Sequence, residues 1–224
     1  MRTPRRSRLL LVALLTLGAL VVVAAVAGAA QRLDTVAGSG TGGFAGDGGA
    51  ATAALLTSPS DVSPLPGGGY LVADTSNHRI RRVAADGTIT TVAGAGPAVG
   101  QTGGFGGDGL PATSTPVRLN QPRGVAVTAD GGFLIADTTN NVIRRVSPAG
   151  IITTVAGIGG QAGQTGDNGS ATSALLTAPQ GVAATPDGGF LIADTGNHRV
   201  RRVDRKSTRL NSSHLSVSRM PSSA

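Results

Sequence analysis

The 224-residue sequence contains no cysteine, no tryptophan and no glutamate. Without cysteine, neither disulfide bonds nor thiol chemistry can contribute to stability or catalysis. Aromatic residues are scarce, with four Phe and one Tyr, so the core has to be built from Val, Ile, Leu and Ala. Aspartate is the only acidic side chain, which narrows the acid–base and metal-binding chemistry available to the chain.

Excess positive charge is confined to the two ends of the sequence. The formal net charge is +7, but four basic residues lie in residues 1–8 and four more in residues 204–224. The segment 9–203 holds eleven Arg and eleven Asp and is formally neutral. A nucleic-acid-binding domain needs excess positive charge on the domain itself, so no nucleic-acid partner is predicted.

One stretch occurs three times, each time preceded by a Gly and an aromatic residue. Each copy predicts two short strands around a turn of Asp, Thr, Asn and Gly. A Pro-initiated, Val-rich strand comes before each copy, and a Thr-Thr-Val-Ala-Gly strand follows the first two. Four short strands per unit without a helical period predict four-stranded antiparallel sheets, which are typical of β-propeller blades. The copies are Leu71–Val83, Leu134–Val146 and Leu191–Val203, and the preceding strands are expected at Pro59–Ser63, Pro122–Thr128 and Pro179–Thr185.

The turn of each copy carries a recognisable pattern. Asn77-His78-Arg79-Ile80 and Asn197-His198-Arg199-Val200 match one another, whereas the middle copy has Asn140-Asn141-Val142-Ile143 without the His. The pattern resembles NHL repeats, which are named for an Asn-His-Leu run at this place. The resemblance covers residues 34–203 and implies an all-β fold of propeller blades, here an incomplete propeller because relatives usually close with about six. It does not define a function, since propellers host many unrelated activities.

A leader precedes the repeats. Met1–Arg8 has four Arg and no acid, and Leu9–Ala30 is apolar or small throughout. A basic start followed by an apolar run is typical of an export signal, and the run is also long enough to span a membrane as one apolar helix. We therefore predict that residues 1–30 are a signal peptide or an N-terminal membrane anchor, and that the rest is extracellular or in the cell envelope. Arg in place of Lys, with much Ala, Gly and Val, indicates a bacterial source.

The repeat domain is expected to cover residues 31–203. Thr35–Gly38 matches the fourth strand of a unit, and Gly181–Val203 supplies strands one to three, so the first is expected to complete the sheet begun by the second. Residues 204–224 break the repeat and resemble the in-frame translation of a sequencing-adapter oligonucleotide. They are predicted to be a non-native tail; a genuine disordered Ser-rich tail is the alternative.

The polar residues of the repeated turn are assigned to structural roles. The Asp at each strand end can accept N–H bonds from the turn, although a ring of acids around a propeller channel is an alternative. The His residues recur at equivalent positions, whereas metal sites usually gather unlike residues. The Arg-Arg pairs of the next strand are expected at the solvated surface or blade edge. The structural turn residues are Asp74, Asn77, His78, Asp137, Asn140, Asp194, Asn197 and His198.

Gly-rich insertions link the repeats at Gly43–Thr52, Gly104–Thr113 and Gly163–Thr172. Each runs into an Ala/Leu segment, such as Ala53-Ala54-Leu55-Leu56, that predicts one helical turn. Each holds one carboxylate, fewer than a calcium loop needs, so the Asp is expected to bond its own loop backbone. Calcium is the alternative, and the candidate loop-binding residues are Asp47, Asp108 and Asp167.

No catalytic constellation is evident. No Ser lies in a nucleophile elbow, and no acid or His lacks counterparts in the other repeats, so no enzyme, cofactor or metal site is predicted. The expected function is an exported NHL-repeat propeller that acts as a non-catalytic binding or scaffold module for a protein, peptide or glycan. One alternative is a fragment of a metal-dependent propeller hydrolase or lyase whose site lies in missing blades. Another is an RNA-binding NHL domain, against which the neutral charge and the leader argue.

Overall fold

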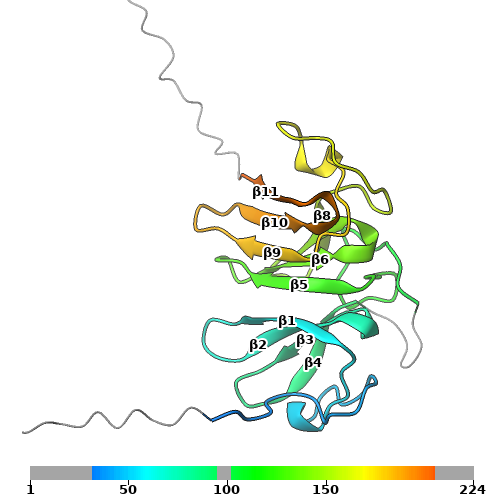
Figure 1. Ribbon diagram of the computed structural model, residues 1–224. Helices are drawn as coiled ribbons and strands as arrows, with labels where there is room; N and C mark the ends of the chain where they lie inside the picture. Colours follow the sequence, from blue (N-terminus) through cyan, green and yellow to red (C-terminus); the bar gives the residue numbers. More distant parts are fainter. Residues whose placement is uncertain (1–31, 95–101, 205–224) are drawn as a thin grey trace, which may run out of the picture. The chain divides into compact units, whose positions relative to one another are not determined.

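The computed structural model describes residues 32–94 and 102–204 (Figure 1). The predicted leader at residues 1–30 and the predicted tail beyond Asp204 lie outside these ranges. The chain divides into a unit that ends at Asp34 and a second unit that begins at Thr35, and the fold below is that of the second. Within the described ranges, no helix is long and apolar enough to cross a membrane.

Three antiparallel sheets form the fold, which confirms the predicted all-β blades. In each sheet consecutive strands pair with one another. The third sheet has three strands among the described residues, so β11 is its edge. The strands are β1 (Pro59–Pro64), β2 (Tyr70–Asp74), β3 (Arg79–Val83) and β4 (Ile89–Ala93); β5 (Pro122–Val127), β6 (Phe133–Asp137), β7 (Val142–Val146) and β8 (Ile152–Ala156); and β9 (Gly181–Ala184), β10 (Phe190–Asp194) and β11 (Arg199–Val203).

A single 3₁₀ turn joins the second and third strands of every sheet. The turns are η2 (Thr75–Asn77), η3 (Thr138–Asn140) and η5 (Thr195–Asn197). Each ends on a residue in the left-handed conformation, namely His78, Asn141 or His198, with φ of 55°, 58° and 55°. Asn and His adopt this conformation more readily than most residues, which explains why Asn141 can stand where the other copies have His.

The sheets pack face to face, with their first strands side by side. β1 contacts β5, and β5 contacts β9 (Figure 1). The approach is close at Gly124 of β5, where an added Cβ would lie 2.7 Å from the carbonyl oxygen of Gln180. A side chain there would force the two strands apart. One apolar core joins the first two sheets and another joins the last two; they include Leu71, Ile80, Val125 and Ile135, and Leu134, Ile143 and Ile192, respectively.

Two details of the prediction need correction. The helical turn expected at Ala53–Leu56 is instead a 3₁₀ helix at Ala51–Ala53, with a counterpart at Ala171–Ser173. Thr35–Gly38 does not complete the third sheet. It lies beside the loop of the first sheet, where the Gly38 N–H donates to the Ala51 carbonyl at 2.9 Å.

Candidate functional site

Arg81 of the first sheet binds the insertion loop Gly43–Thr52 through Asp47. The side chain of Arg81 is fully buried, and its Nη2 lies 2.7 Å from Asp47 Oδ1. Its Nη1 lies 3.4 Å from Oδ2 of the strand-end Asp74. The Thr91 hydroxyl donates to the other Asp47 oxygen at 2.7 Å. The guanidinium thus joins the insertion loop to the end of β2, using several donors of its planar fork.

The same triad recurs in the second and third sheets. In both, the guanidinium lies 2.6 Å from the loop Asp and 3.6 Å from the strand-end Asp. The guanidinium also donates to carbonyls of the loop in each sheet. The two triads are Asp108–Arg144–Asp137 and Asp167–Arg201–Asp194.

Two predictions about these residues were wrong. The first Arg of each pair is not solvated, since the Arg81 and Arg144 side chains have 0% exposure. Strand alternation turns it toward two carboxylates, and the second Arg, such as Arg145 with a 31% exposed side chain, faces outward. The loop aspartates bind these arginines rather than their own backbone. Sequence reasoning missed the buried Arg, although its constant spacing of seven residues after the strand-end Asp was a usable signal.

The strand-end aspartates also fix the start of each sheet. Asp74 and Asp137 have no exposed surface. Asp137 accepts the Asn120 N–H at 2.7 Å and a bond from the Asn140 side chain at 2.8 Å. The same amide group of Asn140 donates to the Gly104 carbonyl of the insertion loop. Burial raises the pKa of Asp137 to about 7, against the opposing effect of these bonds and of Arg144.

We expect this burial to make stability fall as pH rises. Between about pH 4 and 7 the folded Asp137 holds a proton that the unfolded chain has lost, so the free energy of unfolding decreases across that window. The pKa of Asp74 is raised as well, mainly by burial, and adds in the same direction. Urea unfolding at pH 4.5, 5.5, 6.5 and 7.5 measures the slope. Asp137→Asn should flatten it, and an unchanged slope in that variant would contradict the assignment.

Turn residues also link one sheet to the next. The Nδ1 of His78 accepts the Gln121 N–H at 3.0 Å, and Asn141 Oδ1 accepts the Ala178 N–H at 2.8 Å. Burial, and after it the charge of Arg79, lowers the pKa of His78, which keeps the imidazole neutral and able to accept. These residues therefore hold neighbouring blades together.

The first two insertion loops carry a Phe near an arginine, and the second also has exposed apolar side chains. The Arg79 guanidinium lies 3.8 Å from the centroid of the Phe44 ring, and Arg144 lies 5.1 Å from that of Phe105. Phe105 is nevertheless 44% exposed and Leu110 39% exposed. We call the three insertions, Gly43–Thr52, Gly104–Thr113 and Gly163–Thr172, the loop surface. An arginine of the adjacent sheet binds the Asp of each loop, and each of these Asp side chains remains partly exposed to solvent.

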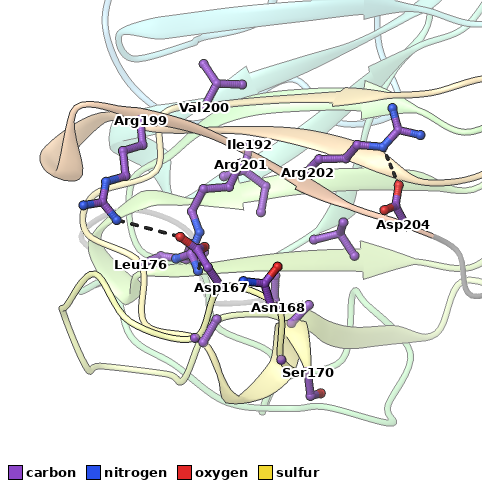
Figure 2. Close-up of a pocket in the computed structure, with 16 residues that line it drawn as sticks. Asp167, Asn168, Ser170, Leu176, Ile192, Arg199, Val200, Arg201, Arg202 and Asp204 are labelled. Carbon is purple, nitrogen blue, oxygen red and sulfur yellow. Dashed lines mark hydrogen bonds and ion pairs between the residues drawn. The ribbon is translucent and has the colours of Figure 1, made fainter.

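Metal-binding groupings are not found in the part of the chain that the structure describes. No group of three His, Cys, Asp or Glu side chains there could hold a metal ion. A hollow of about 1000 Å³ lies beside β11, and Figure 2 shows Arg199 directed at Asp167 and Arg202 at Asp204 along it. Its other walls include Ile192 and Val200, which are apolar.

Stacked antiparallel sheets of three and four strands, in which consecutive strands pair, are typical of β-propeller blades. The family model for the NHL repeat matches residues 119–145 and 176–203. Mouse Teneurin-3 is 38% identical over 106 residues, which cover 42% of this chain and 4% of Teneurin-3. The chloroplastic protein SUPPRESSOR OF QUENCHING 1 of Arabidopsis thaliana is 31% identical over 88 residues, covering 39% of this chain and 8% of that protein.

A solved structure shows the same fold. The crystal structure of a structural genomics protein of unknown function from Bacteroides thetaiotaomicron superposes with a TM-score of 0.51 at 25% identity. The match covers 60% of this chain and 32% of that one. The chain thus carries NHL repeats on propeller blades, and it spans less than a tenth of the length of these two curated relatives.

Proposed function

We propose that this chain is an exported, non-catalytic binding module that holds a protein, peptide or glycan ligand on its loop surface. The observation that carries the proposal is the anchoring of each loop by a buried or nearly buried arginine. A rigid sheet that presents exposed loops is the usual arrangement of binding proteins. Because the loops are held before a ligand arrives, less conformational entropy is lost on binding.

The side chains at the loop surface suit recognition. Phe105 and Leu110 lie in one loop and expose an aromatic and an aliphatic side chain. Aromatic residues are enriched at binding interfaces and their hot spots. The loop aspartates keep between 39% and 59% of their side chains exposed while they bind arginine, and each carboxylate oxygen has more than one acceptor site. They can therefore accept hydrogen bonds from a ligand without losing their anchor.

The alternative of catalysis finds less support in the described residues. The strand-end and loop aspartates are bound to arginines in the same way in all three sheets. An active site gathers groups whose environments differ, so that one can act as acid and another as base. Three equivalent ion-pair triads are instead the pattern of a repeated structural device.

Screening the full chain in mild detergent against a glycan array and a displayed peptide library tests the proposal. Ligands found there should bind Phe105→Ser or Leu110→Ser at least about tenfold more weakly, a loss of roughly 1.4 kcal/mol. Arg145→Ala, which alters an exposed strand residue outside the loop surface, is the matched control and should bind as the parent does. The proposal would be overturned if the loop substitutions left ligand affinity unchanged, or if the protein cleaved the ligands on incubation.

A further inference from the structure

A second hollow lies between the first and second sheets and shares no lining residue with the one beside β11. Its volume is about 620 Å³; β2, β3 and β4 contribute to one wall, and β5, β6 and β7 contribute to the other. Both of these sheets have four paired strands, so the hollow belongs to the packing of two complete repeats. Ligand pockets commonly enclose roughly 300–1,000 Å³, which gives this hollow room for a small molecule.

The walls of this hollow are mostly apolar and only partly closed. Four apolar side chains pack against the core of the first two sheets and yet remain partly exposed, and all four line the hollow. They are Leu65, Val92, Val127 and Phe133. Their exposed surface is apolar area that a bound hydrocarbon would remove from water.

Among the described residues that line the hollow, Arg82 is the only charged one. It lies opposite Leu71 in the pairing of β2 with β3, and Leu71 belongs to the core shared by the first two sheets. Residues directly opposite each other in an antiparallel pair share a face of the sheet. Arg82 therefore lies on the face that the first sheet turns toward the second, and it remains exposed there.

Arg82 lacks the ion pair that its counterparts in the other two sheets have. Arg145 pairs with Asp130, and Arg202 pairs with Asp187. Both aspartates lie in the turn between the first and second strands of their own sheet. The Arg82 guanidinium has no ion-pair or hydrogen-bond partner among the described residues. One of three equivalent arginines thus keeps its donors free, and it is the one that lines this hollow.

Two sequence differences in the turn before β2 account for the free arginine. Leu65 and Gly67 stand where the second repeat has Thr128 and Asp130, whose side chains bond each other at 2.6 Å. Gly67 also has a φ of 83°, so the turn itself takes another course. The compared turns are Leu65–Gly69, Thr128–Gly132 and Thr185–Gly189. The first repeat has therefore lost the carboxylate that would pair with Arg82 and gained an apolar side chain beside the hollow.

We propose that this hollow binds a small apolar carboxylate. The carboxylate pairs with Arg82, and the hydrocarbon body lies against Leu65, Val127 and Phe133. The site is separate from the ligand contacts proposed above, because Phe105 and Leu110 do not line it. It gives the chain a second binding activity, toward a small molecule, that does not depend on the loop surface.

The charge and shape of the site favour a carboxylate over other anions. The planar guanidinium fork matches a carboxylate with two parallel hydrogen bonds. A phosphate monoester carries about two negative charges at neutral pH, which the one arginine of the hollow cannot balance. The Ser147 hydroxyl, which also lines the hollow, accepts the Ile151 N–H and keeps its own O–H as a further donor.

Titration with 4-phenylbutyrate and with its neutral amide, 4-phenylbutyramide, tests the proposal. The two probes share the apolar body and differ in the charged group. Methyl NMR spectra of the full-length chain in mild nonionic detergent should show saturable shifts at Leu65, Val92 and Val127 with the acid. The acid should bind at least about tenfold more tightly than the amide, because it forms charge-assisted hydrogen bonds.

Arg82→Gln should remove this preference, so that the acid binds no more tightly than the amide. The matched control is Arg145→Gln, the same substitution at the equivalent arginine, which does not line the hollow and should leave both affinities unchanged. Phe105→Ser, chosen above for the loop surface, should also leave them unchanged. Failure of this proposal is therefore distinguishable from failure of the proposed function.

Transplanting the turn of the third repeat provides a second variant. Leu65→Thr/Gly67→Asp gives the first turn the Thr-Pro-Asp of Thr185–Asp187. The new Asp should pair with Arg82 and weaken binding of the acid at least about tenfold. Leu65→Thr/Gly67→Asn alters the turn in the same way without a charge, and it should bind the acid more tightly than the Asp variant does. Thermal unfolding confirms that each variant is folded.

Four results would overturn the proposal. They are the absence of saturable binding by the acid, equal affinities for acid and amide in the parent chain, shifts confined to methyl groups outside the hollow, and equal losses in Arg82→Gln and Arg145→Gln.

Discussion

Replacing Arg144 by Ala is expected to destabilise the protein by about 3–5 kcal/mol at pH 7.5, the cost of breaking a buried ion pair from one side. The guanidinium has 0% exposure and lies 2.6 Å from Asp108 and 3.6 Å from Asp137. Its removal leaves Asp137 without a countercharge in the interior and releases the insertion loop. Urea unfolding gives the difference in the free energy of unfolding.

The neighbouring arginine provides the control. Arg145 lies on the opposite face of the same strand with a 31% exposed side chain, and its partner Asp130 is about half exposed. Arg145→Ala should therefore cost less than about 1 kcal/mol. Arg144→Lys, which keeps the charge but loses the planar fork, should fall between the two. Equal effects of Arg144→Ala and Arg145→Ala would contradict the structural role of the triad.

Leu134→Ala is expected to cost about 2–5 kcal/mol, because it removes a fully packed side chain and leaves a cavity. Leu134 is 1% exposed and belongs to the core shared by the second and third sheets. The loss measures how firmly the two sheets pack against each other. Thermal and urea unfolding should both show it.

Leu110→Ala is the matched control for this substitution. Leu110 is 39% exposed at the loop surface, so its truncation should change the free energy of unfolding by less than about 1 kcal/mol. If Leu134→Ala were no more harmful than Leu110→Ala, the sheets would not share a packed core.

The strands and their order could be predicted from the sequence because the same pattern of strands and turns occurs in it three times. The short apolar run around Leu71, Leu134 and Leu191, with Gly before it and Asp after it, predicts both the strand and its turn. The family comparison and the sheet pairing agree with this prediction.

The anchoring of the loops could not be predicted in the same way. Arg81 and Asp47 are 34 residues apart, and nothing local tells whether an arginine in a strand faces water or a distant carboxylate. Average burial statistics favour the surface for Arg, and here the tertiary contact overrides them. The inter-sheet hydrogen bond from the Gln121 N–H to His78 depends on how whole sheets stack, so it could not be predicted from the strand pattern either.

Methyl–methyl NOE spectroscopy tests the stacking of the sheets most directly. The structure predicts cross-peaks between the methyl groups of Leu134 or Ile143 in the middle sheet and those of Leu176 or Ile192 from the third repeat, because all four belong to one core. Cross-peaks confined to residues of the same sheet would show that the sheets do not pack as propeller blades, and would contradict the account.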